Sequence, residues 1–454
     1  MKTVLNKKNL SRFIKMNPRR RKNAIKKFIL PNQKFRILLL TNRDSDNVGD
    51  QVIEACDISL IEAVMKNLGI RGYQYIIDSE AAAIIPKEYV KTKNPELLEK
   101  AHKLIETADV VVFGGAPMFN YDHQIFYERT SITLEIAEAL NKPVIFSGIG
   151  IEGYDETNEK CLRLKKALNL NCVKQITTRD DFTSLEKFIY NENIKIMKVA
   201  DPAVFTKPIF SRFLERPAKR KIGVFVMRRA GFTDNKINFS AEEQAALWKS
   251  TVELLEKKGY DYELITNGHF SDEAFMDYMI REHNIPLENC VFNMNTPEFL
   301  VNKISSYDAV ISCRLHPSII SYALKVPSIG ITWNQKVPLF YESIGYSNRA
   351  LERKDFEADK IILRLEEAME EGVKQDGEYL MTVYNTLFYG IKNAIPPLEK
   401  KSAKPYNFAM LQRKIPLYPG SDEEEKARKL TRKARRTYDN YNELIEKIDT
   451  IQKN

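Results

Sequence analysis

Short apolar runs alternate with helical patterns from residue 35 onward. The first series of strand-sized runs comprises Phe35–Thr41, Tyr73–Ile77, Asp109–Phe113, Pro143–Ser147, Val173–Thr178 and Ile194–Val199. Apolar residues at helical spacing lie between them, at about Asp50–Asn67, Pro95–Glu106 and Gln124–Leu140. Strands that alternate with helices indicate βαβ units and a parallel sheet.

The same pattern starts again after a stretch at 207–219 that contains two prolines and several basic residues. A helical segment at Ala241–Lys258 follows the first strand of the new series, and its strands are expected at Arg220–Met227, Tyr262–Thr266, Cys290–Asn293, Ala309–Ser312 and Ser328–Thr332. The sequence therefore predicts two Rossmann-like, doubly wound α/β domains, at 34–206 and 207–395, in a GT-B-like arrangement with a cleft between them. Ligands of such sheets bind at the carboxyl ends of the strands.

Both ends of the chain differ from these domains. The N-terminal extension, 1–33, is rich in Lys and Arg, and its first thirty residues contain no Asp or Glu, so this segment accounts for the net charge of +9. It predicts peripheral contact with an anionic membrane, with a solubilising tail as the alternative. No nucleic-acid partner is expected, because the tail lacks a known motif. The C-terminal extension, 396–454, ends in a charged helical segment that we expect to pack on the body or on a partner.

Neither a membrane span nor a secretory signal is predicted. Runs such as Ile37–Leu40 and Val110–Phe113 fall short of the roughly 18 apolar residues of a transmembrane helix. The basic cluster Arg19–Lys22 interrupts any apolar core that a secretory signal would need. The five cysteines are widely spaced and form no metal-binding pattern, so we expect reduced thiols and no metal. These features predict a cytoplasmic protein that the basic leader holds near the inner membrane face.

The segment Ser312–Pro317 carries the clearest chemical signal. A strand ends at Ser312, and Pro317 suits the first turn of the next helix, whose free amides favour an anion. Arg314 adds a planar fork for phosphate or carboxylate, and His316 exchanges a proton near neutral pH. The structural alternative is an ordinary helix start with a surface arginine and a packed histidine.

Polar residues follow other strands as well. Asn334 and Lys336 come after the next strand, where Lys336 is either a phosphate ligand or a solvated surface residue. Arg179 and Arg228 end strands in the first and second domains, and arginines there bind anions or form surface ion pairs.

The first domain contributes two further turns. After its first strand, Asn47 and Gly49 are expected to form a tight turn with exposed amides, with Asp50 as the helix N-cap. Gly114 and Gly115 follow another strand, where glycines allow the backbone to approach a ligand closely. A purely structural turn is the alternative in each case.

Taken in order, these elements resemble the polysaccharide pyruvyl transferase family. The family's Asn-x-Gly-Asp turn corresponds to Asn47–Asp50, and its glycine run to Gly114–Gly115. Its Arg-Asp-x-x-Ser element corresponds to Arg179–Ser184, with the serine one place late. Its Asp-Pro-Ala boundary corresponds to Asp201–Ala203, its Ser-x-Arg-Leu-His motif to Ser312–His316, and its later lysine to Lys336. Ala116 stands where the family often has a third glycine. The resemblance covers roughly Phe35 to Gly345.

The resemblance implies transfer of a pyruvyl group from phosphoenolpyruvate to a sugar of a surface polysaccharide or its lipid-linked precursor, forming a ketal without a cofactor. We expect His316 and Arg314 to be catalytic. Donor binding is expected at Arg228, Lys336, Ser312, Asn334 and Arg179, and acceptor binding at Asn47, Gly49, Asp50, Gly114 and Gly115. The alternatives are a GT-B glycosyltransferase that uses a nucleotide sugar and a non-catalytic sugar-binding relative.

Overall fold

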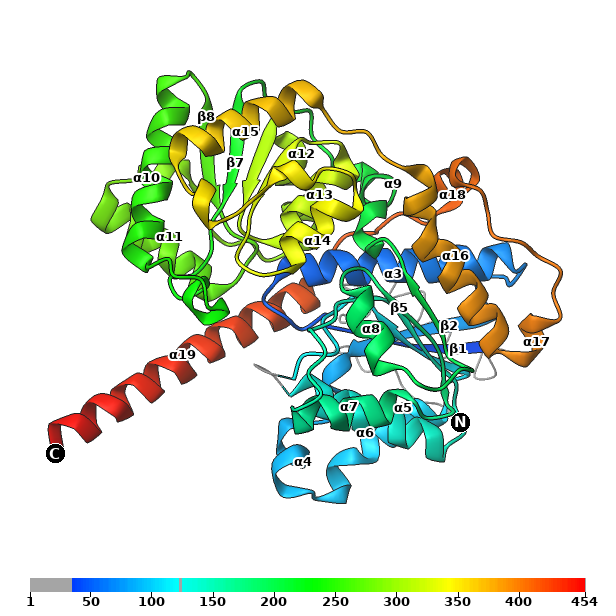
Figure 1. Cartoon of the computed structure of the whole chain (residues 1–454). Coiled ribbons are helices and arrows are strands. Elements are labelled where there is room, and N and C mark those ends of the chain that lie inside the picture. Colours follow the sequence, from blue (N-terminus) through cyan, green and yellow to red (C-terminus); the bar gives the residue numbers. More distant parts are fainter. Residues whose placement is uncertain (1–34, 122–124, 454) are drawn as a thin grey trace, which may run out of the picture.

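The computed structural model describes residues 35–121 and 125–453 and contains two parallel six-stranded sheets (Figure 1). The first sheet has the order β2-β1-β3-β4-β5-β6, with strands at Phe35–Thr41 (β1), Tyr75–Ala81 (β2), Val110–Gly114 (β3), Val144–Ile149 (β4), Val173–Thr178 (β5) and Lys195–Lys198 (β6). Every residue of β3 and β4 is buried, as expected for a parallel sheet covered on both faces.

The second sheet has the order β12-β11-β10-β7-β8-β9. Its strands are Lys221–Phe225 (β7), Asp261–Ile265 (β8), Cys290–Val291 (β9), Ala309–Ser312 (β10), Ser328–Ile331 (β11) and Ala350–Leu351 (β12). The expected two-domain α/β architecture is confirmed. The two-residue strand β12 was not predicted, because two residues carry no periodicity.

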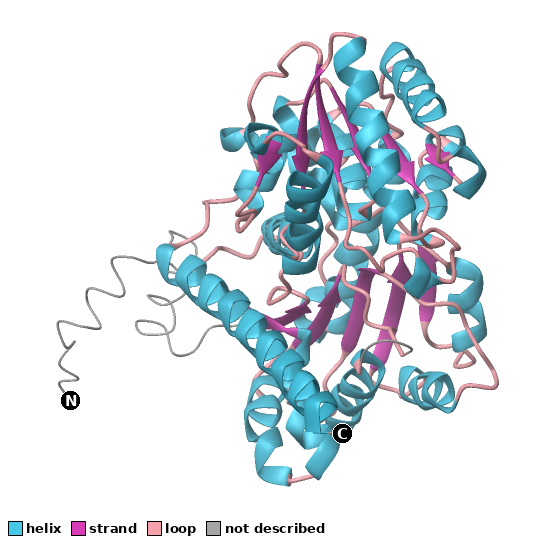
Figure 2. Ribbon diagram, turned by 90° about the vertical axis from the view of Figure 1, so that its left-hand side faces the viewer, coloured by secondary structure: helices cyan, strands magenta, loops and turns pink. Residues whose placement is uncertain are grey.

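Helices cover both faces of each sheet (Figure 2). Those of the first half of the chain are α3 (Val48–Asn67), α4 (Lys87–Thr92), α5 (Glu99–Glu106), α6 (Phe126–Ala139), α7 (Glu159–Leu168), α8 (Phe182–Phe188) and α9 (Thr206–Ile209). Those of the second half are α10 (Ala241–Lys257), α11 (Phe270–His283), α12 (Pro297–Ser306), α13 (Leu315–Leu324), α14 (Lys336–Ser343) and α15 (Ala358–Glu371). The C-terminal helices are α16 (Gly377–Ala394), α17 (Pro396–Glu399), α18 (Phe408–Lys414) and α19 (Glu423–Lys453).

Helix α3 joins the two domains. It is buried along most of its length and packs against α12 and α13 of the second domain. Its Val52 and Ile53 belong to the same apolar cluster as Leu300 and Ile320 of those helices. A helix that is buried nearly all round is an interior helix, and here the interior is the contact between domains.

Helix α16 departs from the predicted domain boundary. The sequence assigned 207–395 to the second domain, yet α16 packs on β4 and β5 of the first sheet (Figure 1). Gln175 of β5 donates to the carbonyl of Thr386 at 3.1 Å, and Gly390 leaves room for Gln175 and Ile145. The local sequence of α16 contains no information on which sheet the helix covers.

The predictions for the basic leader concern residues 1–33, which lie outside the described residues. Within the described ranges, no helix combines the length and apolarity needed to cross a membrane. All five cysteines are free thiols, as expected from their spacing.

Candidate active site between the two domains

The predicted motifs lie at the switch points of the two sheets. In the first sheet, β2 pairs on one side of β1 and β3 on the other; in the second, β8 and β10 flank β7 in the same way. Ligands of open α/β sheets bind where the strand order reverses, outside the carboxyl ends of the strands. Asn47 and Asp50 follow β1, Arg228 follows β7, and Arg314 and His316 follow β10.

The turn after β1 forms hydrogen bonds with the second domain. Asn47 is the N-cap of α3, and its Oδ1 accepts from the amide of Gly49 at 3.0 Å. Asn267, which follows β8, donates from Nδ2 to the same oxygen at 2.8 Å, and its carbonyl accepts from the amide of Val48 at 2.8 Å. The N-cap is therefore Asn47 and not Asp50, which lies in the first helical turn.

Gly49 touches His316 directly across this contact. A Cβ on Gly49 would lie 2.4 Å from the Cβ, Cγ and Nδ1 atoms of His316, far inside van der Waals contact. The sequence predicted a glycine needed for a turn with exposed amides. In the structure, the missing side chain lets α3 approach the histidine of the other domain.

The amide of Asn47 faces one ring nitrogen of His316. His316 Nδ1 lies 3.2 Å from Asn47 Nδ2 and 3.4 Å from Asn47 Oδ1. Because Oδ1 already accepts from Gly49 and Asn267, we assign Nδ2 as the donor to the neutral ring. Nδ1 then accepts, which leaves the proton of the neutral ring on Nε2. Nε2 lies 3.7 Å from Asp50 Oδ1 and has no hydrogen-bond partner within the described part of the chain.

The charges around His316 keep the ring neutral. Burial lowers its pKa well below the ordinary value, and the cations Arg179, Lys336 and Arg314 lower it further. The expectation of an acid already poised near neutral pH is thus wrong for the ligand-free protein. An anion among these cations would cancel their field and raise the pKa of His316.

The pKa of Asp50 shifts in the opposite direction. Burial raises the pKa of its carboxyl to about 6, although Arg179 and hydrogen bonds from Ser45 and Asn42 oppose the rise. Asn42 Nδ2 donates to Asp50 Oδ2 at 2.7 Å, so Oδ1 is the oxygen that faces His316. A carboxyl with this pKa exchanges a proton near neutral pH.

Arg314 is held by a carboxylate that the sequence analysis did not identify. Its Nε donates to Asp272 Oδ2 at 2.9 Å, its Nη2 pairs with Asp272 Oδ1, and its guanidinium lies 5.6 Å from the ring centroid of Trp333. Asp272 also accepts from the amide of Arg228 at 2.9 Å. Ser312 shapes the turn, because its hydroxyl accepts from the Arg314 amide at 3.0 Å and donates to the Arg314 carbonyl at 2.7 Å.

Lys336 and Asn334 lie together at the start of α14. Asn334 Oδ1 accepts from the Lys336 amide at 3.1 Å, so this side chain orders the turn. The Lys336 ammonium forms no ion pair with any residue that the structure describes, and its charge contributes to the low pKa of His316. Lys336 is therefore a cation available to an anionic ligand.

The remaining predicted arginines already have carboxylate partners. Arg179 is buried, pairs with Asp201 and donates to the Gly115 carbonyl at 2.9 Å. Arg228 pairs with Asp234 and is 38% exposed, which places it at the rim. Arg179 acts on His316 and Asp50 through its field and by fixing the first-domain turn.

Gly114 and Gly115 lie against helix α3. A Cβ on Gly114 would lie 2.2 Å from Asp57 Oδ2, and one on Gly115 would lie 2.8 Å from Ile53. The Gly115 amide donates to Asp57 at 3.1 Å, and burial raises the pKa of that carboxyl well above its usual value. Both glycines are needed for packing against α3, and the acceptor contact expected of them stays a prediction.

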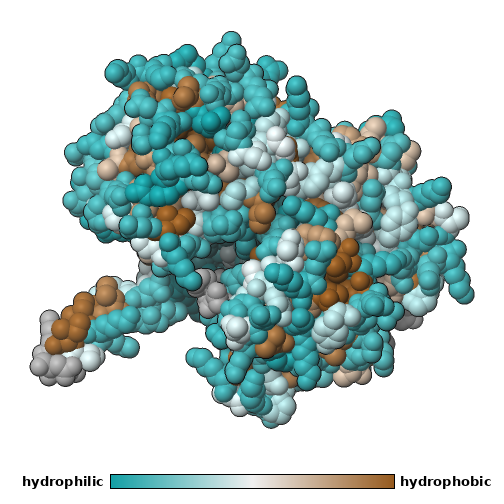
Figure 3. All heavy atoms as spheres, in the orientation of Figure 1, coloured by the Kyte–Doolittle hydropathy of each residue, from teal (hydrophilic) through white to brown (hydrophobic). Residues whose placement is uncertain are grey.

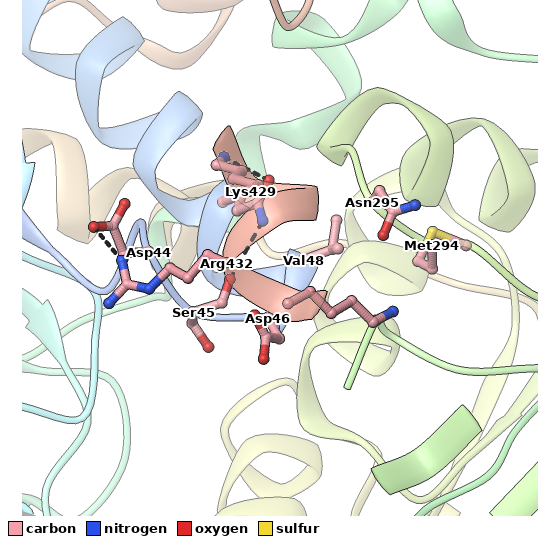
Figure 4. A pocket seen from close by; sticks show the side chains of 11 residues that line it. Asp44, Ser45, Asp46, Val48, Met294, Asn295, Lys429 and Arg432 are labelled. Atoms are coloured by element: carbon pink, nitrogen blue, oxygen red, sulfur yellow. Dashed lines mark hydrogen bonds and ion pairs between the residues drawn. The ribbon is translucent and has the colours of Figure 1, made fainter. Parts of the chain in front are cut away.

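The C-terminal helix α19 crosses the mouth of the cleft. Arg428 and Arg432 pair with Asp44 of the first domain, and Lys433 pairs with Glu273 of the second. Beneath the helix is a small pocket lined by Asp44, Ser45, Asp46, Val48, Gln51, Gly268, Met294, Asn295, Lys429, Arg432 and Lys433. Figure 4 shows Lys429 and Arg432 over the turn of Asp44, Ser45 and Asp46.

A family model described as polysaccharide pyruvyl transferase matches residues 7–335. The chain belongs to this family. The match begins in the basic leader, which the motif comparison had placed outside the resemblance, and it ends one residue before Lys336. Asn47, Asp50, Arg314 and His316 all lie within the matched range of this polysaccharide pyruvyl transferase family member. None of the curated proteins matches the chain.

Solved structures are similar to this family member at low sequence identity, and one of them reaches a TM-score of 0.50. A putative UDP-N-acetylglucosamine 2-epimerase from Listeria monocytogenes aligns with a TM-score of 0.50 and 11% identity, covering 82% of this chain and 99% of that chain. A UDP-GlcNAc 2-epimerase from Methanocaldococcus jannaschii aligns with a TM-score of 0.48 and 13% identity, covering 78% and 98%. A glycosyltransferase from Rickettsia africae gives 0.44 and 14%, covering 84% and 97%. The expected GT-B-like fold class is confirmed.

Proposed function

We propose that the protein transfers a pyruvyl group from phosphoenolpyruvate to two hydroxyls of a sugar, forming a cyclic ketal and releasing phosphate. The acceptor sugar belongs to a surface polysaccharide or its lipid-linked precursor. Membership of the transferase family supports this reaction. The observation that carries the proposal is the buried His316–Asp50 pair within the field of Arg179, Lys336 and Arg314.

The donor's charges suit these cations. Phosphoenolpyruvate carries a carboxylate and a phosphate, and fixed cations stabilise the charge that develops on a departing phosphate. Lys336 has no carboxylate partner in the described chain, and Asp272 holds Arg314 in one orientation. Arg228 at the rim is a supporting donor ligand, and Ser312 and Asn334 fix the two turns that present Arg314 and Lys336.

Proton transfer balances with one acid/base unit. Carbon 3 of the enol takes one proton, and the cationic carbon 2 is attacked by the first sugar hydroxyl, which gives up its proton. The C2–O bond to phosphate then breaks, the second hydroxyl closes the ring, and its proton leaves with phosphate. The unit that protonates carbon 3 is therefore restored by the first hydroxyl.

His316 and Asp50 together form this unit in our proposal. The donor's anions offset Arg179, Lys336 and Arg314, so the pKa of His316 rises on binding. The proton that His316 then gains goes to Nδ1, which lies 3.4 Å from Asn47 Oδ1 as its acceptor. The pKa of Asp50, about 6, allows its carboxyl to exchange the proton on Nε2, which it faces. The sugar hydroxyls are placed on the side of Asn47 and Asp50, under the wall formed by α19.

The test is an assay of the purified full chain with phosphoenolpyruvate and a panel of sugar acceptors. The expected result is acceptor-dependent release of phosphate and a sugar product heavier by one pyruvyl ketal. His316→Gln and Asp50→Asn are expected to lower turnover by at least about 100-fold, whereas Glu253→Gln on the exposed face of α10 serves as a control. Release of a nucleotide from a nucleotide sugar, with no reaction of phosphoenolpyruvate, would instead identify a GT-B glycosyltransferase.

A further inference from the structure

The second half of α19 has no cover from the rest of the described chain. Every residue from Tyr438 to Ile451 is exposed, and Figure 1 shows this part pointing away from both sheets. The first half differs, because Arg428, Arg432 and Lys433 fasten it to both domains. Helices in water owe most of their stability to packing of an apolar face, and this half lacks such packing.

The exposed half carries an apolar stripe with a seven-residue repeat. Tyr441, Leu444 and Ile445 form its middle, and it continues at positions seven residues away in both directions, at Tyr438, Ile448 and Ile451. Figure 3 shows apolar residues gathered on this free end. A strict repeat of seven keeps one face of a helix against a second helix.

The size of the stripe matches a helix pair. Tyr438 and Tyr441 are 64% and 61% exposed and Ile451 is 74% exposed. The six large side chains at such exposures present on the order of 600 Å² of apolar surface per helix. Burying the stripe of two copies would remove roughly 1,200 Å² from water, the lower end of stable protein interfaces.

Charge argues against a lipid surface as the occupant. Between Tyr438 and Ile451 there are four carboxylates and one lysine, a net charge of −3, contributed by Asp439, Glu443, Glu446, Asp449 and Lys447. Helices that lie on anionic membranes are rich in Lys and Arg on their polar face. This segment would be repelled by such a membrane.

We propose that the exposed halves of α19 from two copies of this chain pair antiparallel and form a twofold dimer. A twofold interface uses the same patch on both copies. Parallel pairing would set each carboxylate beside its own copy. Antiparallel pairing centred on Leu444 and Ile445 leaves only Glu443 and Glu446 level with each other. It also sets Arg435 and Arg436 beside the partner's last helical turn, the negative end of the helix dipole.

The first test is the mass of the full chain in solution, measured by sedimentation over a concentration series. The wild type should behave as a dimer. Leu444→Glu combined with Ile448→Glu should weaken association by at least about 100-fold, since charges enter the buried stripe. The matched control, Asn442→Glu combined with Thr450→Glu, adds the same charge off the stripe and should remain dimeric.

Cross-linking tests the direction of pairing. Ile451→Cys alone should form no disulfide between copies, whereas a mixture of Ile451→Cys and Tyr438→Cys chains should. A wild-type sample controls for the native thiols, of which Cys290 is the least buried. Self-linking of Ile451→Cys would overturn the antiparallel arrangement.

Three results would overturn the dimer itself: a monomeric wild type, a dimer that survives the two stripe glutamates, or a dimer lost on deletion of residues 1–33. The last result would indicate that the basic leader, and not a second copy of α19, contacts the stripe. Stripe-dependent binding to anionic vesicles by a monomeric chain would assign it to a membrane. Folding of each variant is checked by its unfolding temperature and circular dichroism.

Discussion

Replacing Gly49 with alanine should damage both stability and activity through a single contact. The new Cβ would lie 2.4 Å from three atoms of His316, about 1 Å or more inside a normal carbon contact of about 3.5–4.0 Å. Overpacking of this kind costs about 1–3 kcal/mol. Alanine recovers up to about 1 kcal/mol of helix propensity, so the free energy of unfolding should fall by about 1–2 kcal/mol.

Activity should fall further than stability suggests. His316 can escape the new methyl group only by moving away from Asn47 and Asp50, and a displacement of about 1 Å at a reacting group costs roughly 100-fold in rate. Urea unfolding measures the first effect, and the initial rate of phosphate release measures the second. Gly377→Ala is the matched control, because its Cβ would meet Phe408 at an ordinary 3.8 Å at the start of α16.

A double-mutant cycle isolates the contact. In a His316→Gly background, all three clashing atoms are absent, so Gly49→Ala should become neutral or stabilise by up to about 1 kcal/mol. The reasoning is refuted if Gly49→Ala costs the same in both backgrounds. It is also refuted if Gly49→Ala alone leaves stability and rate at wild-type values.

Three further predictions follow. Asp50→Asn should raise the unfolding free energy at pH 7, because burial disfavours the charge of a carboxyl whose pKa is about 6, while lowering turnover by about 10²–10⁴-fold; a normal rate would remove Asp50 from the proposed unit. Burial lowers the pKa of His269 to about 4, so below pH 6.5 the unfolded chain takes up a proton that the folded chain does not. Between pH 6.5 and 4 the unfolding free energy of the wild type should therefore fall by up to about 1.4 kcal/mol per pH unit relative to that of His269→Gln. Parallel curves of unfolding free energy against pH for the two proteins would contradict this. Asp44→Asn removes the carboxylate that pairs with Arg428 and Arg432, so limited trypsin digestion should cut α19 faster than in the wild type, and 0.5 M salt should narrow the difference.

Much of the fold could be predicted from the apolar pattern. The strands Phe35–Thr41, Val173–Thr178 and Ala309–Ser312 have the predicted bounds, because each is a short run buried in a parallel sheet. Which of the two sheets α16 covers could not be predicted from the sequence. That choice depends on contacts of Gly390 and Thr386 with β5, more than two hundred residues earlier in the chain.

The sequence indicated which residues belong to the site, but not which of them pair with one another. The sequence places Arg314 and His316 after a strand, but it does not reveal Asp272 as the partner of Arg314, because that pair joins separate elements. Asn267, which fixes Asn47, carried only a weak signal, a polar Asn-Gly-His turn after a strand. The low pKa of His316 depends first on burial and then on cations, and both arise only in the folded chain.

The most direct test of the central claim follows the pKa of His316 as the donor binds. Nitrogen-15 NMR of the histidines reports which ring nitrogens carry protons, and phosphoenolpyruvate is titrated in at pH 7 without acceptor. We predict a neutral ring protonated at Nε2 in the free protein and a protonated ring in the complex, with the signal assigned through His316→Gln. A ring that is charged before binding, or that stays neutral at saturation, would contradict the proposed site.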